Sequence, residues 1–482
     1  MNIVSTYTWC QFTPAFGLVG LAALLILADA LLPRLPKRLY GAIAAAGAFV
    51  AAFVLAAGEH ANGFGCIAAI ATGLSILLAF DYTKVSCESI AGSGNEEGTG
   101  EFYALPLVAC AGILCLTQAR DLIMLFVSLE VVTLTSYVLA GYFRRNQGSI
   151  EAGIKYLVLG AMSTGILVYG IAWYFGTTGT FGLGAETVYS ALRGGVAGTQ
   201  QIIPAFMMAI TMLFAGAFFK VGAAPMHVWI PDVYQGAPTP ATTFLAVASK
   251  TAGFALLCSL IMPFARFCTP GSMPGSIIVW AMAIVAAATL LIGNLGAMRQ
   301  TNIKRLLGYS SIGQAGFILV FFLQLQGAVE FHVREYLLAY ALATSAAFFA
   351  VAMVRTQRGS EEIAAFRGLA RTNPRTAFLI TVCFASLAGV PLTLGFMVKL
   401  KAFATAISVI HNWDAFGWLL PIMIITAATG FYYYFKVLRA MYWEQPQPGT
   451  PALRVPLCTG FVLSICALAL IILGTRPLLL LF

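Results

Sequence analysis

The sequence predicts an all-α polytopic membrane protein, and three observations lead to that fold class. Charged residues make up 9% of the 482 residues, whereas soluble domains carry about 25%. Hydrophobic residues reach 60%, with a mean hydropathy of +0.89, so a water-soluble chain would expose apolar patches far larger than monomers tolerate. The apolar runs are long and continuous rather than alternating, which excludes a transmembrane β-barrel. The composition also excludes cytosolic enzymes, nucleic-acid-binding proteins and disordered chains.

The apolar segments give the expected number of crossings. At about 20 apolar residues per crossing, a chain of this length could hold roughly 12 to 16 helices. Fourteen apolar segments can be recognised, so about fourteen transmembrane helices are expected. The segments are 15–33, 40–57, 64–80, 103–118, 122–142, 153–175, 203–235, 241–262, 276–297, 303–325, 334–354, 377–411, 416–437 and 456–475. The stretch 81–101 is polar and rich in glycine, serine and acids at its centre, which predicts a loop.

The basic residues gather in alternate loops of this helix scheme. The net charge of +9 therefore reflects placement in a lipid bilayer rather than a nucleic-acid partner. Loops that carry most of the Lys and Arg residues stay on the cytoplasmic side of a membrane. This bias predicts that both termini lie outside. The residues expected inside include Lys37, Arg144, Arg299, Arg355 and Arg439, whereas Arg120 is among the few expected outside.

Two of the apolar segments are too long for a single straight crossing. Residues 203–235 and 377–411 would each form a helix of roughly 50 Å, whereas the hydrocarbon core is about 30 Å thick. Each contains a proline that interrupts helical hydrogen bonding, Pro225 in the first and Pro391 in the second. The pattern is compatible with an ordinary kink, or with a pair of discontinuous helices of the kind that marks the transport path in many transporters.

Four ionisable residues fall well inside apolar segments, where a charge is costly. They are Glu130, Lys220, Lys250 and Lys399. One interpretation is a static ion pair between Glu130 and one lysine that holds helices together. The favoured interpretation is a proton relay, because one acid and three deep lysines on separate helices exceed what a structural pair requires. A carboxylate that moves changes how tightly a nearby buried lysine holds its proton, and water can join such groups.

His227 follows Pro225 by two residues and is a further candidate for proton transfer at the helix break. The alternative is a polar residue with a structural role only. No other histidine stands at metal-ligand spacing, and the ten cysteines form no C-x-x-C pair, so no metal or iron–sulfur site is expected. The sequence also lacks a glycine-rich dinucleotide fingerprint. No cofactor bound by this chain is therefore predicted.

Several motifs resemble the antiporter-like subunits of respiratory complex I. The longest is FKVGAAPMHVWIPDVYQGAPTP at residues 219–240, whose second half is most similar to the subunit N branch of that family. KRLLGYSSI at residues 304–312 is a second matching motif. SLE at 128–130, and GVP at 389–391 followed by GF at 395–396, add to the resemblance.

The resemblance implies a specific arrangement of helices. It implies fourteen helices with two inverted five-helix repeats, in which helices 7 and 12 are broken. The implied divisions are N-terminal helices 1–3 (1–102), a first repeat (103–262), a second repeat (276–437) and a C-terminal helix 14 (438–482). The two overlong segments coincide with helices 7 and 12.

The resemblance also implies a function, that of a proton-translocating membrane-arm subunit of NADH–quinone oxidoreductase in the bacterial inner (cytoplasmic) membrane. Glu130 and Lys220 would be the functional pair, and Lys250 and Lys399 would continue a polar axis. The family also has a functional lysine where Lys304 stands. The chain would be a subunit of a translocase without redox chemistry of its own. NADH, FMN, iron–sulfur clusters and quinone would be bound by partner subunits, and other membrane-arm subunits, including antiporter-like neighbours, would be its partners.

One position departs from the family pattern. Gln314 stands where many members carry histidine, and an amide can order water but cannot titrate, so a relay there would run through water or another group. Alternatives to the complex I assignment are a subunit of a multisubunit Na⁺/H⁺ antiporter or of a membrane-bound hydrogenase, a stand-alone solute carrier, and an assembly scaffold. The VYQG sequence at 233–236 argues against the first two. The titratable character of the buried groups argues against the carrier.

Overall fold

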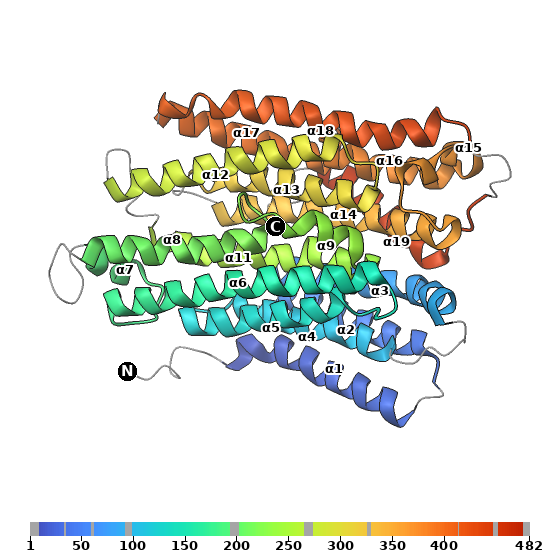
Figure 1. Cartoon of the computed structure of the whole chain (residues 1–482), viewed down its shortest axis with the longest axis horizontal. Coiled ribbons are helices and arrows are strands. Elements are labelled where there is room, and N and C mark those ends of the chain that lie inside the picture. The colour runs from blue at the N-terminus through green and yellow to red at the C-terminus, as the bar shows by residue number, and fades with distance from the viewer. Residues whose placement is uncertain are drawn as a thin grey trace.

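The fold is a bundle of helices with nearly parallel axes, with α1 at one edge and α17 and α18 at the other (Figure 1). The structure is a computed structural model that describes residues 9–32, 35–58, 62–91, 99–192, 202–264, 273–324, 329–412, 414–446 and 452–475. Within these ranges there is no strand, and the β-bridges Asp121–Gly182 and Asn302–Glu362 are isolated. The predicted all-α class is therefore confirmed.

The helices follow the apolar segments of the sequence. In chain order they are η2 (Trp9–Phe12), α1 (Thr13–Leu31), α2 (Lys37–Ala57), α3 (Gly63–Ala91), α4 (Thr99–Leu116), α5 (Leu122–Ala140), α6 (Gln147–Thr178), α7 (Ala185–Leu192), α8 (Ile202–Val221), α9 (Trp229–Gly236), α10 (Thr239–Phe244), η3 (Leu245–Ser249), α11 (Lys250–Ile261), η4 (Met262–Phe264), α12 (Met273–Met298), α13 (Ile303–Phe321), α14 (Val329–Arg358), η5 (Ile363–Phe366), α15 (Leu369–Thr372), α16 (Pro374–Ala388), α17 (Leu394–Asn412), η6 (Asp414–Phe416), α18 (Leu419–Tyr442) and α19 (Leu457–Thr475). The element η3 is a π-helical turn.

Eleven helices in the described ranges are long and apolar enough to cross a membrane. They cover every predicted segment except 103–118, 303–325 and 416–437. Those segments form α4, α13 and α18, which are helical but fall outside the eleven. The multi-pass membrane class is confirmed by this result, and the count of fourteen crossings stays a prediction.

The prediction of a loop at 81–101 is wrong in part. The helix α3 continues through Ala91, and α4 already begins at Thr99. Residues 81–91 contain neither glycine nor proline, so nothing in that stretch interrupts helical hydrogen bonding. The most glycine-rich part, 92–98, lies outside the described residues.

Small residues allow the helices to pack closely, as is common between membrane helices. A Cβ atom on Gly293 of α12 would lie 2.3 Å from the backbone nitrogen of Gly313 on α13. A Cβ atom on Gly216 of α8 would lie 2.9 Å from the Cβ of Leu167 on α6. Large apolar side chains instead face outward on the periphery, such as Phe53 on α2 and Leu457 on α19. Large apolar side chains are thus found on the surface as well as in the core, as expected of a protein surrounded by lipid.

One end of the bundle carries the segments 141–146, 299–302 and 359–373, and we refer to it as the basic end. Its short helix α15 and the helix ends around it are seen at the right of Figure 1. The isolated bridge between Asn302 and Glu362 ties two of these segments together. The basic end therefore contains the loops that the sequence predicts on the cytoplasmic side.

Candidate functional site: a row of buried lysines

The first overlong segment is two helices, because α8 ends at Val221 and α9 begins at Trp229. Gly222 has a φ of +76°, which only glycine adopts readily. The N–H of Ala223 donates to the carbonyl of Phe218 over 2.9 Å, and this bond together with the glycine forms a Schellman cap. The prediction of a true break, rather than a kink, is confirmed for this segment.

The backbone groups freed at this break have partners, as a membrane interior requires. The indole Nε1 of Trp229 donates to the carbonyl oxygen of Phe219 over 3.0 Å. The N–H of Ala224 donates to the hydroxyl of Thr289 on α12 over 2.9 Å. The side chain of Trp229, after the break, and that of Thr289, on α12, therefore substitute for missing helical hydrogen bonds.

Lys220 lies in the last turn of α8, directly before the break, and its side chain is 6% exposed. Its ammonium donates to the hydroxyl of Thr133 on α5. Glu130 lies one turn earlier on the same helix and accepts a 2.9 Å hydrogen bond from Thr164 of α6. Lys220 and Glu130 form no ion pair in the described structure, and Glu130 lies one turn from the threonine that binds the lysine. Lys220 and Glu130 therefore have different hydrogen-bond partners, Thr133 and Thr164, and their functional pairing stays a prediction.

Lys250 is 2% exposed and begins α11, directly after the π-helical turn η3. Its ammonium donates to the carbonyl oxygen of Ser311 on α13 over 2.6 Å, and also to the hydroxyl of that serine. The ring of Tyr340 lies below it, with the ring centroid 5.4 Å from Nζ. α11 packs so closely against α8 at Gly253 that a Cβ atom there would lie 3.0 Å from the carbonyl carbon of Lys220. This tight packing brings the helices of the first two lysines together.

The second overlong segment breaks in the same way. α16 ends at Ala388 and α17 begins at Leu394. Gly389 has a φ of +89°, and the N–H of Val390 donates to the carbonyl of Ala385 over 2.9 Å. The backbone thus repeats the Schellman cap of the first break.

Lys399 lies on α17, and its side chain turns back to the end of α16. Its ammonium donates to the carbonyl oxygens of Leu387 (2.8 Å) and Ala388 (2.9 Å). These are among the last carbonyls of α16, where the helix dipole is negative. The side chain is 7% exposed. The partners of Lys399 are therefore backbone dipoles.

A chain of hydrogen bonds connects the surroundings of Lys250 to those of Lys399. Ser310, next to the serine that binds Lys250, shares a hydrogen bond with the hydroxyl of Tyr434 on α18. That hydroxyl accepts from Nε2 of Gln314 over 3.3 Å. The same Nε2 donates to the carbonyl oxygen of Leu387 over 3.0 Å, and this oxygen also binds Lys399. Gln314 therefore stands at the centre of the connection.

His227 lies apart from this row. It is half-buried in the turn after the first break, and its Nδ1 has no hydrogen-bond partner among the described residues. The neighbouring Pro225 and Val228 are exposed, the latter to 64%. The same outward direction is found at the second break, where Leu392 is 72% exposed. Among the described residues no hydrogen bond joins His227 to a buried lysine, and its part in proton transfer stays a prediction.

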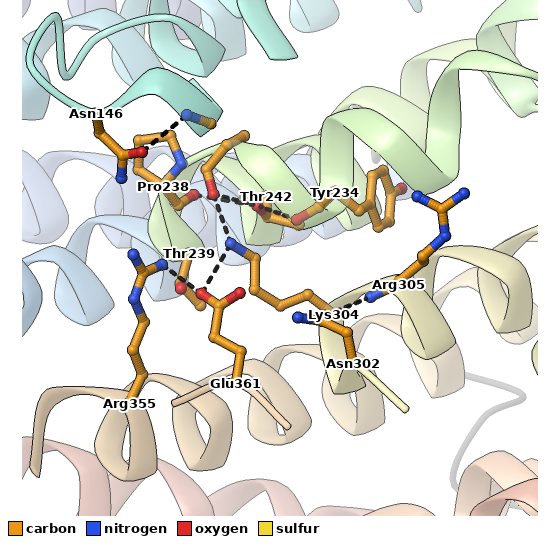
Figure 2. Close-up of polar contacts among 12 residues, drawn as sticks. Asn146, Tyr234, Pro238, Thr239, Thr242, Asn302, Lys304, Arg305, Arg355 and Glu361 are labelled. Atoms are coloured by element: carbon orange, nitrogen blue, oxygen red, sulfur yellow. Dashed lines mark hydrogen bonds and ion pairs between the residues drawn. The ribbon is translucent and has the colours of Figure 1, made fainter. Parts of the chain in front are cut away.

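Lys304 is fully buried in the first turn of α13, at the basic end of the bundle (Figure 2). Its ammonium donates to the carbonyl oxygen of Ala237 over 2.6 Å and lies 3.2 Å from Oε1 of Glu361. Arg355 of α14 binds the same carboxylate oxygen. Figure 2 shows the carboxylate of Glu361 between these two cations.

A pocket of about 360 Å³ opens next to this cluster. Glu361, Arg355 and Arg305 are among its lining residues, and a second acid on its wall, Asp232, binds Arg305 over 2.7 Å. Asp232 also pairs with Lys155 of α6 over 2.9 Å. The pocket is thus lined by side chains of both signs.

Sequence reasoning missed three elements of this polar system. Glu361 and Arg355 lie at a helix end, where charged residues are ordinary. Glu335 of α14 is 5% exposed and pairs with Lys401 of α17 over 2.6 Å. An acid inside the predicted crossing 334–354 was the signal that could have identified that pair. In the described part of the chain no group of three metal-binding side chains occurs.

Fold and site define a polytopic helical membrane protein with two broken helices and a buried lysine row. The sequence of residues 119–425 matches the family model for the transmembrane part of the NADH:quinone oxidoreductase/Mrp antiporter proteins. The chain belongs to this family, and the resemblance seen in its motifs is confirmed.

The relatives resemble the chain over most of its length. It is 34% identical to NADH-quinone oxidoreductase subunit N of Brevibacillus brevis over 499 residues, which covers 98% of the chain and 94% of the relative. It is 38% identical to subunit N of Moorella thermoacetica over 386 residues, which covers 78% of the chain and 76% of the relative.

Solved structures share the fold. A chain of respiratory complex I from Thermus thermophilus superposes with a TM-score of 0.76 at 30% identity, covering 97% of this chain and 98% of that one. A chain of the Mrp complex from Dietzia sp. has a TM-score of 0.77 at 19% identity, covering 98% of this chain and 96% of that one. The second likeness concerns the fold alone.

Proposed function

We propose that the chain is a proton-translocating membrane-arm subunit of NADH–quinone oxidoreductase, placed in a bacterial inner membrane with both termini outside. Membership of the family, the subunit N relatives and the likeness to a complex I chain support this assignment. As a subunit of a translocase it leaves the redox chemistry to partner subunits, which bind NADH, FMN, iron–sulfur clusters and quinone. Other membrane-arm subunits and the lipid bilayer are its partners.

The row of buried lysines is the observation that carries the proposal. Lys220, Lys250 and Lys399 come from three helices, and each donates to hydroxyl or backbone carbonyl oxygens in the described structure rather than to a carboxylate. A buried ammonium without a neutralising partner is costly, so a small electrostatic change suffices to release its proton. A group in this condition can hold and release a proton during turnover.

The proposed transport follows the row. A proton taken up from the inside is held near Lys220 and Lys250, and it leaves toward the outside by way of Lys399. Coupling arrives as an electric field, because movement of the Glu130 charge toward or away from Lys220 changes the proton affinity of that lysine. One pKa unit corresponds to about 1.4 kcal/mol, so a change of a few units is enough to drive uphill transfer.

A subunit of a Na⁺/H⁺ antiporter complex or of a membrane-bound hydrogenase is the second candidate. The fold is shared by an Mrp complex and by an archaeal membrane-bound sulfane sulfur reductase, the latter with a TM-score of 0.78 at 22% identity. The subunit N relatives favour complex I. The neighbouring genes distinguish the candidates, because genes for NADH-oxidising subunits accompany a complex I subunit.

Replacement of Lys250 tests the proposed function. In inverted membrane vesicles, Lys250→Ala should lower proton uptake per NADH oxidised while the complex still assembles. Lys436→Ala is the matched control, because Lys436 lies on α18 at the basic end and contacts the carbonyl of Gln300. Parental pumping in Lys250→Ala would contradict a relay through this row and favour a scaffold.

A further inference from the structure

The buried lysine closest to the basic end has no direct route to solvent. Lys304 is 0% exposed, whereas Glu361 beside it is 12% exposed and lines the pocket of about 360 Å³. The carboxylate therefore lies between the pocket and the ammonium. Within the described residues it is the acid that pairs with Lys304.

The backbone holds Glu361 in this position. The N–H of Ile303, at the start of α13, donates to the carbonyl of Glu361 over 2.9 Å. The N–H of Ile363 donates back to the carbonyl of Thr301 over 2.9 Å. These two bonds fasten the segment of Glu361 to the start of the helix that carries Lys304, so the carboxylate stays within reach of the lysine.

Two helices place cations against the carboxylate. Lys304 approaches from α13 and Arg355 from α14. The guanidinium of Arg355 lies over the ring of Tyr82, 5.4 Å from its centroid. Arg355 binds the same carboxylate oxygen as Lys304, and it can therefore hold the ionised carboxylate when Lys304 is neutral.

The helix α13 continues from this cluster to the lysine row. Ser311, which binds Lys250, follows Lys304 by seven residues on the same helix. Residues seven apart lie on the same face two turns apart. A proton on Lys304 is thus on the face of α13 that leads to Lys250.

We propose that Glu361 is the group through which this chain takes up protons from the basic end, with Arg355 as its positioning residue and Lys304 as the first acceptor. The inference rests on the proposed function. Hydronium that enters the pocket from the bulk gives a proton to the carboxylate of Glu361 and is left as water, and the carboxylic acid passes the proton to the neutral amine of Lys304. Lys304 becomes an ammonium, and the carboxylate, ionised again, returns to Arg355.

Chemical rescue separates this role from that of a structural ion pair. The experiment uses the assembled complex in inverted vesicles and compares Glu361→Gln, Glu361→Asp and the control Glu362→Gln, whose side chain is exposed next to the same site. Loss of a positioned proton-transfer group should slow NADH-driven proton uptake about tenfold or more in Glu361→Gln. Glu361→Asp should keep a substantial part of it, and Glu362→Gln should pump like the parent. Addition of azide or formate, small acids that fit the pocket, should restore uptake in Glu361→Gln.

Two results would overturn the inference. One is parental pumping in Glu361→Gln, and the other is a loss in Glu361→Gln that neither azide nor formate restores while the complex is assembled. The Lys250→Ala variant, assayed in parallel, separates this failure from that of the proposed function. If Lys250→Ala stops pumping and Glu361→Gln does not, only the uptake route is wrong.

Discussion

The two helix breaks share one backbone design but hold their lysines differently. Gly222 and Gly389 both adopt a left-handed conformation and close the same type of cap. At the first break Lys220 binds the hydroxyl of Thr133, one turn from the Glu130 carboxylate. At the second break Lys399 binds two backbone carbonyls of α16.

The difference separates an adjustable site from a fixed one. A side chain such as that of Glu130 can move, so it can alter the electric field at Lys220. Backbone carbonyls at a helix end cannot, so Lys399 meets a constant negative dipole. The first break is therefore suited to receive a signal, and the second to accept a proton that the first has released.

The largest expected effect on proton pumping comes from replacing Lys220 or Lys399. Lys220→Ala and Lys399→Ala should each reduce proton pumping about tenfold or more, since a positioned proton carrier contributes at least that factor. Lys220→Arg should also impair pumping, because arginine keeps its proton. The measurement is proton uptake by inverted vesicles, normalised to assembled complex. Full activity in both Lys220 variants would remove the first break from the proton path.

A smaller effect is expected from Glu130, and it should be confined to the first break. Glu130→Gln keeps the shape and removes the charge, so Lys220 should release its proton too easily and pumping should fall several-fold. Glu130→Asp keeps the charge on a shorter side chain and should retain partial activity. The same vesicle assay decides the question. If Glu130→Asp is the worse variant, the field of this carboxylate is not the signal.

The smallest effect concerns the two glycines and tests whether the breaks differ in rigidity. Alanine at either position should cost about 1–2 kcal/mol, because the left-handed conformation crowds a Cβ atom. At Gly222 the new Cβ would meet the flexible end of Ile230, whereas at Gly389 it would lie 2.9 Å from Cδ of Lys399. Both variants should lose activity sooner on heating, and only Gly389→Ala should also pump poorly at low temperature. Equal pumping defects in the two variants would contradict the comparison.

The sequence predicted the features that depend on local chemistry. Segment length and Pro225 and Pro391 located both breaks, and hydropathy located Lys220 and Lys250 in the interior. The partners of these lysines could not be predicted, because Thr133 and Ser311 come from helices distant in the chain. Their approach depends on helix packing rather than on a local pattern.

The solvent or lipid exposure of individual side chains was equally hard to predict. The proximity of His227 to Pro225 suggested a place on the proton path, which stays a prediction, whereas the exposure of its neighbours Pro225 and Val228 gave no sequence signal. Glu361 carried no sequence signal, because an acid beside a basic helix end is typical of a solvated loop. Its position beside Lys304 depends on the bridge between Asn302 and Glu362, which holds that loop against the start of α13.

The direction of the lysine row determines which steps the membrane voltage affects. The hydrogen-bonded connection passes from α11 to α13, α18 and α16, whose axes run side by side across the membrane (Figure 1). Because the amide of Gln314 cannot titrate and the carbonyl of Leu387 only accepts, a proton that crosses here moves through water beside this connection, parallel to the membrane plane, and the voltage does little work on that step. From Lys304 to the level of Ser311 a proton moves along α13 for about 10 Å, roughly a third of the hydrocarbon thickness. At 100 mV that step involves about 0.8 kcal/mol, so voltage acts on loading and release and leaves the lateral transfer between helices almost unaffected.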